Sequence, residues 1–269
     1  MNTIDRLGVQ LYTLRSEMEK NLEETLSRVA AIGYQEVEFA GYFERSPSEI
    51  RHLLDQHGLS APSVHVDYKS IEANLDRVVE AAQIIRHRYI VNSMIDPNLI
   101  SNPDGWKQAA ELFNRAGEFT RKAGIQFAYH NHFFEFLPLN GKLPYDILLE
   151  SCDPEFLKME MDFCWMAAVK QDPFPYFRRY PGRFPLVHLK QLKNIPARGP
   201  EDRADFGFFE RAMPELSDVG EGVIDWKSVL SQSMQAGVQH FFVEHDAPQS
   251  PFGSIQASYA YLQELRLLL

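Results

Sequence analysis

Two histidines and a glutamate fall close together in the segment AYHNHFFEF, residues 128–136. His130 and His132 end an apolar run, and Glu135 follows three positions later. Burying unpaired polar groups costs several kcal/mol, so a buried cluster of this kind is expected where a ligand or an ion satisfies it. Imidazole and carboxylate groups bind cations, and the same groups move protons.

Polar side chains end other apolar runs in the same way. Residues two apart on a strand face the same side, so His188 and Lys190 are candidates for one site. A single such residue could equally be satisfied within the core, but Asp162, His188 and Glu244 end three separate runs. The full set at these positions adds Glu38, His65 and Asp246 to the residues already named.

This mixture of donors predicts a divalent metal. One imidazole with two or three carboxylates suits Mn²⁺, Mg²⁺ or Co²⁺, with Zn²⁺ as an alternative. The two cysteines, Cys152 and Cys164, lack the spacing of a thiolate site. A bound ion can clamp two neighbouring oxygens of a sugar and stabilise the enediolate that forms when the adjacent carbon loses a proton.

The elements that must position these residues alternate along the whole chain. Short β-rich apolar runs are followed by amphipathic stretches, beginning with LGVQLYTL and LEETLSRVAAIG. Eight such units in 269 residues favour a closed (β/α)8 TIM barrel, in which the carboxyl ends of the strands carry the chemistry. No G-x-G-x-x-G follows the first strand, which argues against a dinucleotide-binding sheet. Without a low-complexity linker, we expect one domain over residues 1–269.

Composition restricts the partners. The formal net charge is −10, and no basic stripe is present that would bind a nucleic acid. The N-terminus lacks the layout of a signal peptide, and no apolar run approaches the roughly 18 residues that suggest a membrane span. We expect a cytoplasmic protein with a small-molecule substrate, either monomeric or homo-oligomeric. The stretch 192–220 is too long for a plain connection and is typical of a lid, an interface element or a disordered segment.

Seven segments resemble, in order and over nearly the whole chain, the sugar phosphate isomerase/epimerase family of xylose-isomerase-like TIM barrels. That group includes tagatose 3-epimerase, hydroxypyruvate isomerase, inosose dehydratase and, more distantly, AP endonucleases. The segments are GVQLYTLR, AAIGYQEVEFAG, AGIQFAYHNHFFEF, MEMDFCW, PGRFPLVHLK, DVGEGVIDW and VEHDAP.

The resemblance implies a divalent metal held by a Glu, an Asp, a His and a second Glu from separate strands. Asp162, His188 and Glu244 match three of these places. Where the epimerases have the first Glu, this chain has Ala128, so by analogy with the inosose dehydratases Glu135 takes the fourth place, with a neighbouring histidine, His130 or His132, as the alternative.

The remaining polar residues receive roles beside the metal. His130 or His132 is expected to act as acid/base, with Lys190 and Glu244 as further catalytic groups. Trp165 is expected to stack on the sugar, although a Trp just past a strand is as often a packed rim residue. Glu38 and His65 complete the expected substrate-binding residues.

Three functions remain open from the sequence. The resemblance favours a metal-dependent isomerase or epimerase of carbohydrate metabolism. Loss of the Glu within the fifth strand keeps open a lyase, such as a dehydratase, or an enzyme that cleaves keto-glycosides at the same metal site. A carbohydrate-binding barrel without activity is the second alternative, and an endonuclease is disfavoured because the chain lacks a basic face.

Overall fold

Eight parallel strands close into a barrel in the computed structural model, which describes residues 6–197 and 207–266. Their order around the barrel is β1-β10-β7-β6-β5-β4-β3-β2, so the first strand pairs with the last. The predicted (β/α)8 TIM barrel is therefore confirmed. The barrel strands are β1 (Gly8–Gln10), β2 (Glu36–Ala40), β3 (Ser60–Val66), β4 (Tyr89–Asn92), β5 (Gln126–His130), β6 (Leu157–Asp162), β7 (Leu186–Leu189) and β10 (His240–Val243).

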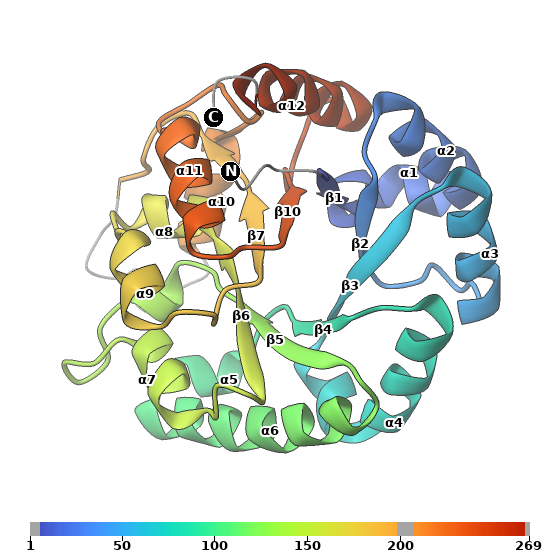
Figure 1. Cartoon of the computed structure of the whole chain (residues 1–269). Coiled ribbons are helices and arrows are strands. Elements are labelled where there is room, and N and C mark those ends of the chain that lie inside the picture. Colours follow the sequence, from blue (N-terminus) through green and yellow to red (C-terminus); the bar gives the residue numbers. More distant parts are fainter. Residues whose placement is uncertain (1–5, 198–206, 267–269) are drawn as a thin grey trace.

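Helices surround the strands, as the view along the barrel in Figure 1 shows. The long helix α6 (Pro103–Lys122) buries Trp106, Phe113 and Ala116. The glycines at 33 and 58 end two helices with φ of 118° and 64°, values that a residue with a Cβ rarely adopts. The other helices are α1 (Arg15–Lys20), α2 (Leu22–Ile32), α3 (Pro47–His57), α4 (Tyr68–Ile85), α5 (Pro97–Ile100), α7 (Pro144–Ser151), α8 (Phe163–Ala168), α9 (Phe174–Arg179), α11 (Trp226–Gln235) and α12 (Pro251–Arg266). Within the described ranges, no helix combines the length and the apolar character that crossing a bilayer requires.

The stretch 192–220 forms an excursion between β7 and α11. It contains α10 (Gly207–Ala212) and the 3₁₀ turn η3 (Met213–Glu215), and the short strands β8 (Gln191–Leu192) and β9 (Leu216–Ser217) pair antiparallel at its ends. Two further 3₁₀ turns, η1 (Leu11–Leu14) and η2 (Phe134–Phe136), follow β1 and β5. The sequence-based prediction for this stretch also covers residues 198–206, which lie outside the described residues.

An apolar layer fills the barrel below the level of the polar residues. Its members come from four strands and are fully or almost fully buried. On β1 the corresponding position is Gly8, where a Cβ atom would collide with the ring of Phe242, so the missing side chain lets that ring fill the interior. The layer consists of Tyr89, Val91, Ala128, Leu186 and Phe242.

Candidate active site

Polar residues form the layer directly above the apolar one. Since side chains two apart on a strand share a face, the residues that follow Ala128 and Leu186 in this way also point into the barrel. These are His130 and His188. Glu244 likewise follows Phe242 of β10 by two residues. Ala128 therefore belongs to the apolar layer, and His130 is the residue by which β5 reaches the polar one.

A network of histidines and carboxylates forms the floor of the site. His65 Nε2 lies 2.6 Å from Glu160 Oε2 and 3.2 Å from Glu38 Oε2. His188 Nε2 lies 2.7 Å from the same Glu38 oxygen, which also accepts a hydrogen bond from Gln10. Burial acts to lower the pKa of His65, but Glu38 and Glu160 outweigh it and raise that pKa to about 10. Glu38 is fully buried in this floor and does not line the cavity above, whereas His65 and Trp165, the other expected substrate-binding residues, do.

Lys190 lies among three carboxylates above this floor. Its Nζ atom is 2.7 Å from Glu244 Oε2, 3.2 Å from Asp162 Oδ2 and 3.0 Å from Asp246 Oδ1. Burial acts to lower the pKa of Lys190, but these carboxylates outweigh it and hold that pKa well above its usual value. The side chain is therefore a buried ammonium group.

The two carboxylate oxygens of Asp162 have different roles: one caps a helix and the other faces the site. Oδ1 accepts hydrogen bonds from the backbone N–H groups of Cys164 and Trp165 and so caps α8. Oδ2 is buried and has no hydrogen-bond partner. A buried carboxylate oxygen without a hydrogen bond calls for a ligand.

Four side chains could hold a divalent ion at this level. The donor atoms of His130, Asp162, His188 and Glu244 all lie within 4.8 Å of one another. Two imidazoles with two carboxylates suit Mn²⁺, Co²⁺ or Zn²⁺. Asp162 Oδ2 forms an ion pair with Lys190 but has no hydrogen bond, so it could also bind an ion. A second group of four donors, built around His65 and Glu160, is already joined internally by the short contacts of the floor.

Glu135 is not part of either group of donors. The turn η2 carries it away from the barrel interior, where it accepts hydrogen bonds from Tyr129 Oη at 2.6 Å and from His132 N at 3.0 Å. Burial raises the pKa of Glu135 to about 8. Of the expected ligands, the structure brings Asp162, His188 and Glu244 together with His130, while Glu135 lies apart from them.

Asn131, between the two histidines, links β5 to β6. Its amide accepts a hydrogen bond from Asp162 N at 3.1 Å and donates one to Asp162 O at 3.3 Å. The backbone pairing of β5 with β6 ends at His130 and Glu160. The side chain of Asn131 extends this connection to Asp162. Asn131 thus positions Asp162, a role that the sequence analysis missed because the residue carries no charge.

His132 and Trp165 present unpartnered polar atoms to the cavity. His132 Nδ1 and Trp165 Nε1 are buried without a hydrogen bond, and both residues line the cavity. The rings lie 5.9 Å apart, and Lys190 Nζ lies 5.2 Å from the centre of the Trp165 ring. Burial is the main cause that lowers the pKa of His132 to about 3, which leaves the imidazole neutral.

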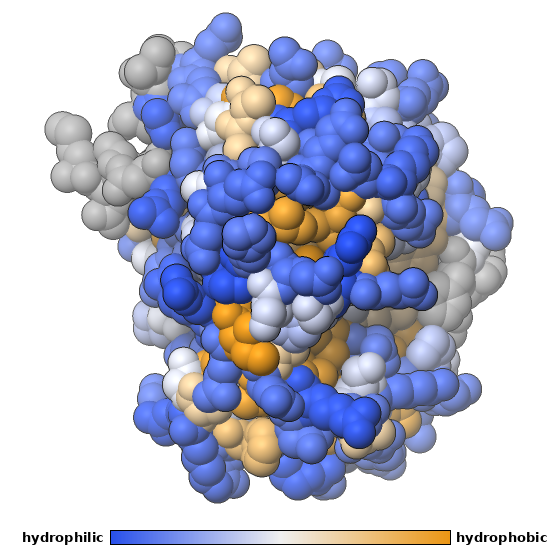
Figure 2. Space-filling model, turned by 90° about the vertical axis from the view of Figure 1, so that its right-hand side faces the viewer, coloured by the Kyte–Doolittle hydropathy of each residue, from blue (hydrophilic) through white to orange (hydrophobic). Residues whose placement is uncertain are grey.

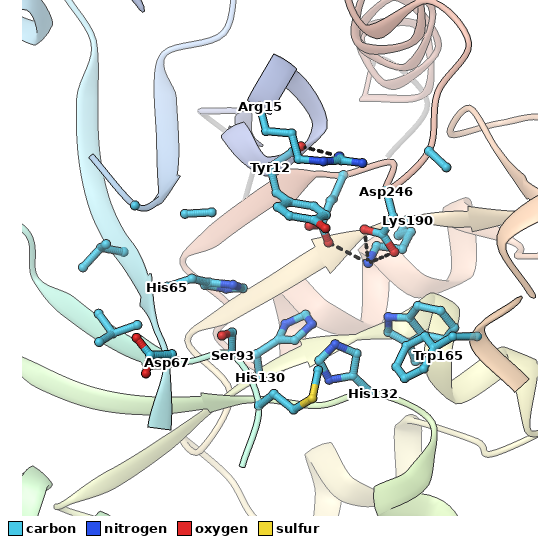
Figure 3. A pocket seen from close by; sticks show the side chains of 18 of the residues that line it. Tyr12, Arg15, His65, Asp67, Ser93, His130, His132, Trp165, Lys190 and Asp246 are labelled. Carbon is cyan, nitrogen blue, oxygen red and sulfur yellow. Dashed lines mark hydrogen bonds and ion pairs between the residues drawn. The ribbon is translucent and has the colours of Figure 1, made fainter. Parts of the chain in front are cut away.

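A cavity of about 950 Å³ lies above these residues. Figure 3 shows His65, His130 and His132 at its base, with Lys190, Asp246 and Trp165 on one side and Tyr12 and Arg15 on another. Phe209, Glu210 and Met213 of the excursion also line it. The polar residues thus converge on one open cavity that is large enough for a small organic ligand.

Comparisons with known proteins agree with this architecture. A family model described as xylose isomerase-like TIM barrel matches residues 26–265. Inosose dehydratase of Lacticaseibacillus casei is 21% identical over 265 residues, covering 90% of this chain and 87% of that protein.

Two solved structures share the fold. A sugar phosphate isomerase/epimerase from Parabacteroides distasonis has a TM-score of 0.77 at 21% identity, covering 96% of this chain and 97% of that one. The IOLI protein, whose structure holds a zinc atom, has a TM-score of 0.73 at 13% identity, covering 97% and 98%.

Proposed function

Since the chain belongs to the xylose isomerase-like TIM barrel family, we propose that it is a divalent-metal-dependent lyase that removes water from a keto-cyclitol or keto-sugar. One observation carries this choice: an unpartnered imidazole, His132, and an ammonium group, Lys190, line the same cavity. Elimination needs one group that takes a proton and another that gives one.

The carboxylates of the site support elimination over epimerisation. An epimerase passes a proton across one carbon between two carboxylates, which must both be free to exchange it. Here Glu244 contacts His188 and Lys190, and Asp246 contacts Lys190. The name of the relatives, inosose dehydratase, supports the same reaction class.

His130, Asp162, His188 and Glu244 would hold the metal. When bound there, a divalent ion would polarise the substrate carbonyl and stabilise the negative charge that develops on its oxygen.

The side chains of the protein would perform the proton transfers. His132 takes the proton from the carbon next to the carbonyl, the carbon–oxygen bond at the following carbon breaks, and Lys190 protonates the departing hydroxyl. The products are water and a ring with a double bond conjugated to the carbonyl, so atoms and charges balance. Glu244 keeps the ammonium group of Lys190 in place, and His65 and Trp165 contact the hydroxyl groups and the ring face of the substrate.

The test is to incubate the protein, loaded with Mn²⁺ or Co²⁺, with 2-keto-myo-inositol and to determine the mass of the product. We expect a product lighter by one water and new ultraviolet absorbance from the conjugated carbonyl. His132→Gln should reduce the rate by about 10²–10⁴, the usual contribution of an acid/base group, without loss of metal. A substrate that binds and remains unchanged would contradict the proposal.

An isomerase or epimerase is the second candidate. It is favoured by the fold shared with the Parabacteroides distasonis protein and begins with the same proton abstraction. In D₂O it would give a product with one deuterium and no loss of water, which distinguishes it from the lyase.

A further inference from the structure

The cavity continues beyond the polar residues into a region that we call the apolar arm. The arm is formed by the end of β2 and the loop after it, by β3, by α4 and by the loop after β4. All but one of its side chains are only partly buried, so the protein alone does not cover them. The residues of the apolar arm are Ala40, Tyr42, Val64, Val66, Val78 and Met94.

The outer face of the molecule over α2 and α3 is mostly hydrophilic, with hydrophobic side chains between the hydrophilic ones (Figure 2). The apolar arm, by contrast, lies within the cavity. Apolar surface left open beside a polar site is typical of ligand contact.

The apolar arm does not suit a phosphate. Of the described residues that line the cavity, Arg15 and Lys190 are the cations other than histidine, and neither belongs to the arm. Lys190 contacts three carboxylates, and Arg15 donates to Tyr12 O at 2.8 Å while its guanidinium lies 4.1 Å from the centre of the Tyr12 ring. Asp67, at the edge of the arm, adds negative charge and accepts hydrogen bonds from Ser70.

The cavity is larger than a single sugar ring would fill. At about 950 Å³ it lies near the upper end of the 300–1,000 Å³ typical of ligand pockets. A six-carbon ring bound at the polar residues would leave the arm facing water, where its apolar surface is unfavourable.

From this arrangement we infer that the keto-sugar substrate carries an apolar substituent, as in an aryl or alkyl keto-glycoside, and that the apolar arm binds the substituent. The inference rests on the proposed function, because the sugar ring is assigned to the metal and the imidazoles. It narrows the proposed substrate to a keto-sugar with an apolar aglycone. Ordinary glycosides, which lack the carbonyl group and cannot react, serve as binding probes.

The experiment compares phenyl and methyl glycosides of glucose, galactose and mannose by calorimetric titration of the metal-loaded protein. We expect one of the sugars to bind as its phenyl glycoside about 10- to 100-fold more tightly than as its methyl glycoside, since a phenyl ring buries much more apolar area. Val66→Thr and Met94→Gln should reduce this preference to less than about threefold and leave methyl glycoside binding unchanged.

Ile84→Thr is the matched control, because Ile84 is an exposed apolar residue of α4 outside the arm. It should keep the full preference. Equal binding of phenyl and methyl glycosides, or no measurable binding of any phenyl glycoside, would overturn the inference. If the preference persists but a chelator leaves methyl glycoside binding unchanged, the arm is supported and the metal site of the proposed function fails instead.

Discussion

The double role of Asp162 explains how a carboxylate can be held in place and still be available to an ion. Asp162 Oδ1 caps α8, which fixes the side chain, and the Asn131 side chain fixes the backbone of Asp162. The second oxygen is therefore positioned without a direct hydrogen bond to any protein group. Groups that orient a ligand residue in this way commonly change metal affinity by 10- to 100-fold when removed.

Whether Glu135 or His130 is the fourth metal ligand can be tested directly by metal binding. Glu135→Gln should leave metal occupancy near that of the unchanged protein, because the carboxylate bonds Tyr129 and a backbone N–H group on the helix side of β5. His130→Gln should weaken metal binding, because it removes one of four donors. Metal content after dialysis against a limiting ion concentration checks both variants.

Arg179→Ala is the control for this comparison, since Arg179 is an exposed side chain that pairs with Glu150 far from the cavity. If Glu135→Gln lost the metal while His130→Gln retained it, the expectation drawn from the sequence would be right and the proposal of His130 as a ligand wrong.

His87 predicts a pH dependence of stability. It is buried, its Nδ1 atom lies 2.7 Å from Ala61 O, and its Nε2 atom lies 3.0 Å from Tyr42 Oη. Burial lowers the pKa of His87 to about 4. Above pH 6.5 the imidazole is neutral in both states, but between pH 6.5 and 4 the unfolded chain binds a proton that the folded chain does not.

The folded state should thus lose up to about 3 kcal/mol as the pH falls through this window. His87→Gln, which can still pair with Ala61 and Tyr42, should show a shallower decline in urea-unfolding free energy between pH 7 and pH 4.5. Parallel declines in the two proteins would exclude His87 as the cause.

At the scale of elements, the pattern of apolar and polar residues was sufficient to predict the barrel and most of the rim. Asp162, His188 and Glu244 end strands whose alternation fixes the face of each side chain. The same alternation predicts that Glu160, two residues before Asp162, faces the same side of β6. It could not place Glu135, because the period of two ends with β5 and the turn η2 sets the direction of that side chain.

The packing of α6 against the start of β6 gives a prediction at this scale. A Cβ atom on Gly117 would collide with the carbonyl group of Phe156. Gly117→Ala should therefore destabilise the fold by up to about 2 kcal/mol, because overpacking costs about 1–3 kcal/mol and the gain in helix propensity is about 1 kcal/mol.

Gly253→Ala in α12 is the matched control, since its Cβ would meet the side chain of Ser250, at 2.8 Å from Oγ and 3.3 Å from Cβ, and no backbone atom is among its nearest contacts. It should be neutral or slightly stabilising. Urea-unfolding midpoints measure both variants, and equal stabilisation by the two substitutions would contradict the close contact at Gly117.

At the scale of the whole molecule, metal binding should stabilise the barrel, because the ligands come from four strands. An ion at 100 times its Kd adds about 2.7 kcal/mol, and each kcal/mol raises the Tm of a chain of this size by about 2–4 °C. Chelation should therefore lower the Tm by about 5–10 °C, and adding Mn²⁺ or Co²⁺ should restore it. Asp162→Asn should show no response, and an undiminished response in that variant would contradict the ligand assignment.

The pairing of the first barrel strand with the last has a consequence for how the protein is made. Gly8 pairs with Phe242, and the contact of Thr13 with His245 spans 232 positions. On the ribosome, at about 5–20 residues per second, the amino-terminal strand therefore waits on the order of tens of seconds for its partner. During this time the nascent chain has open strand edges, which can pair with other chains.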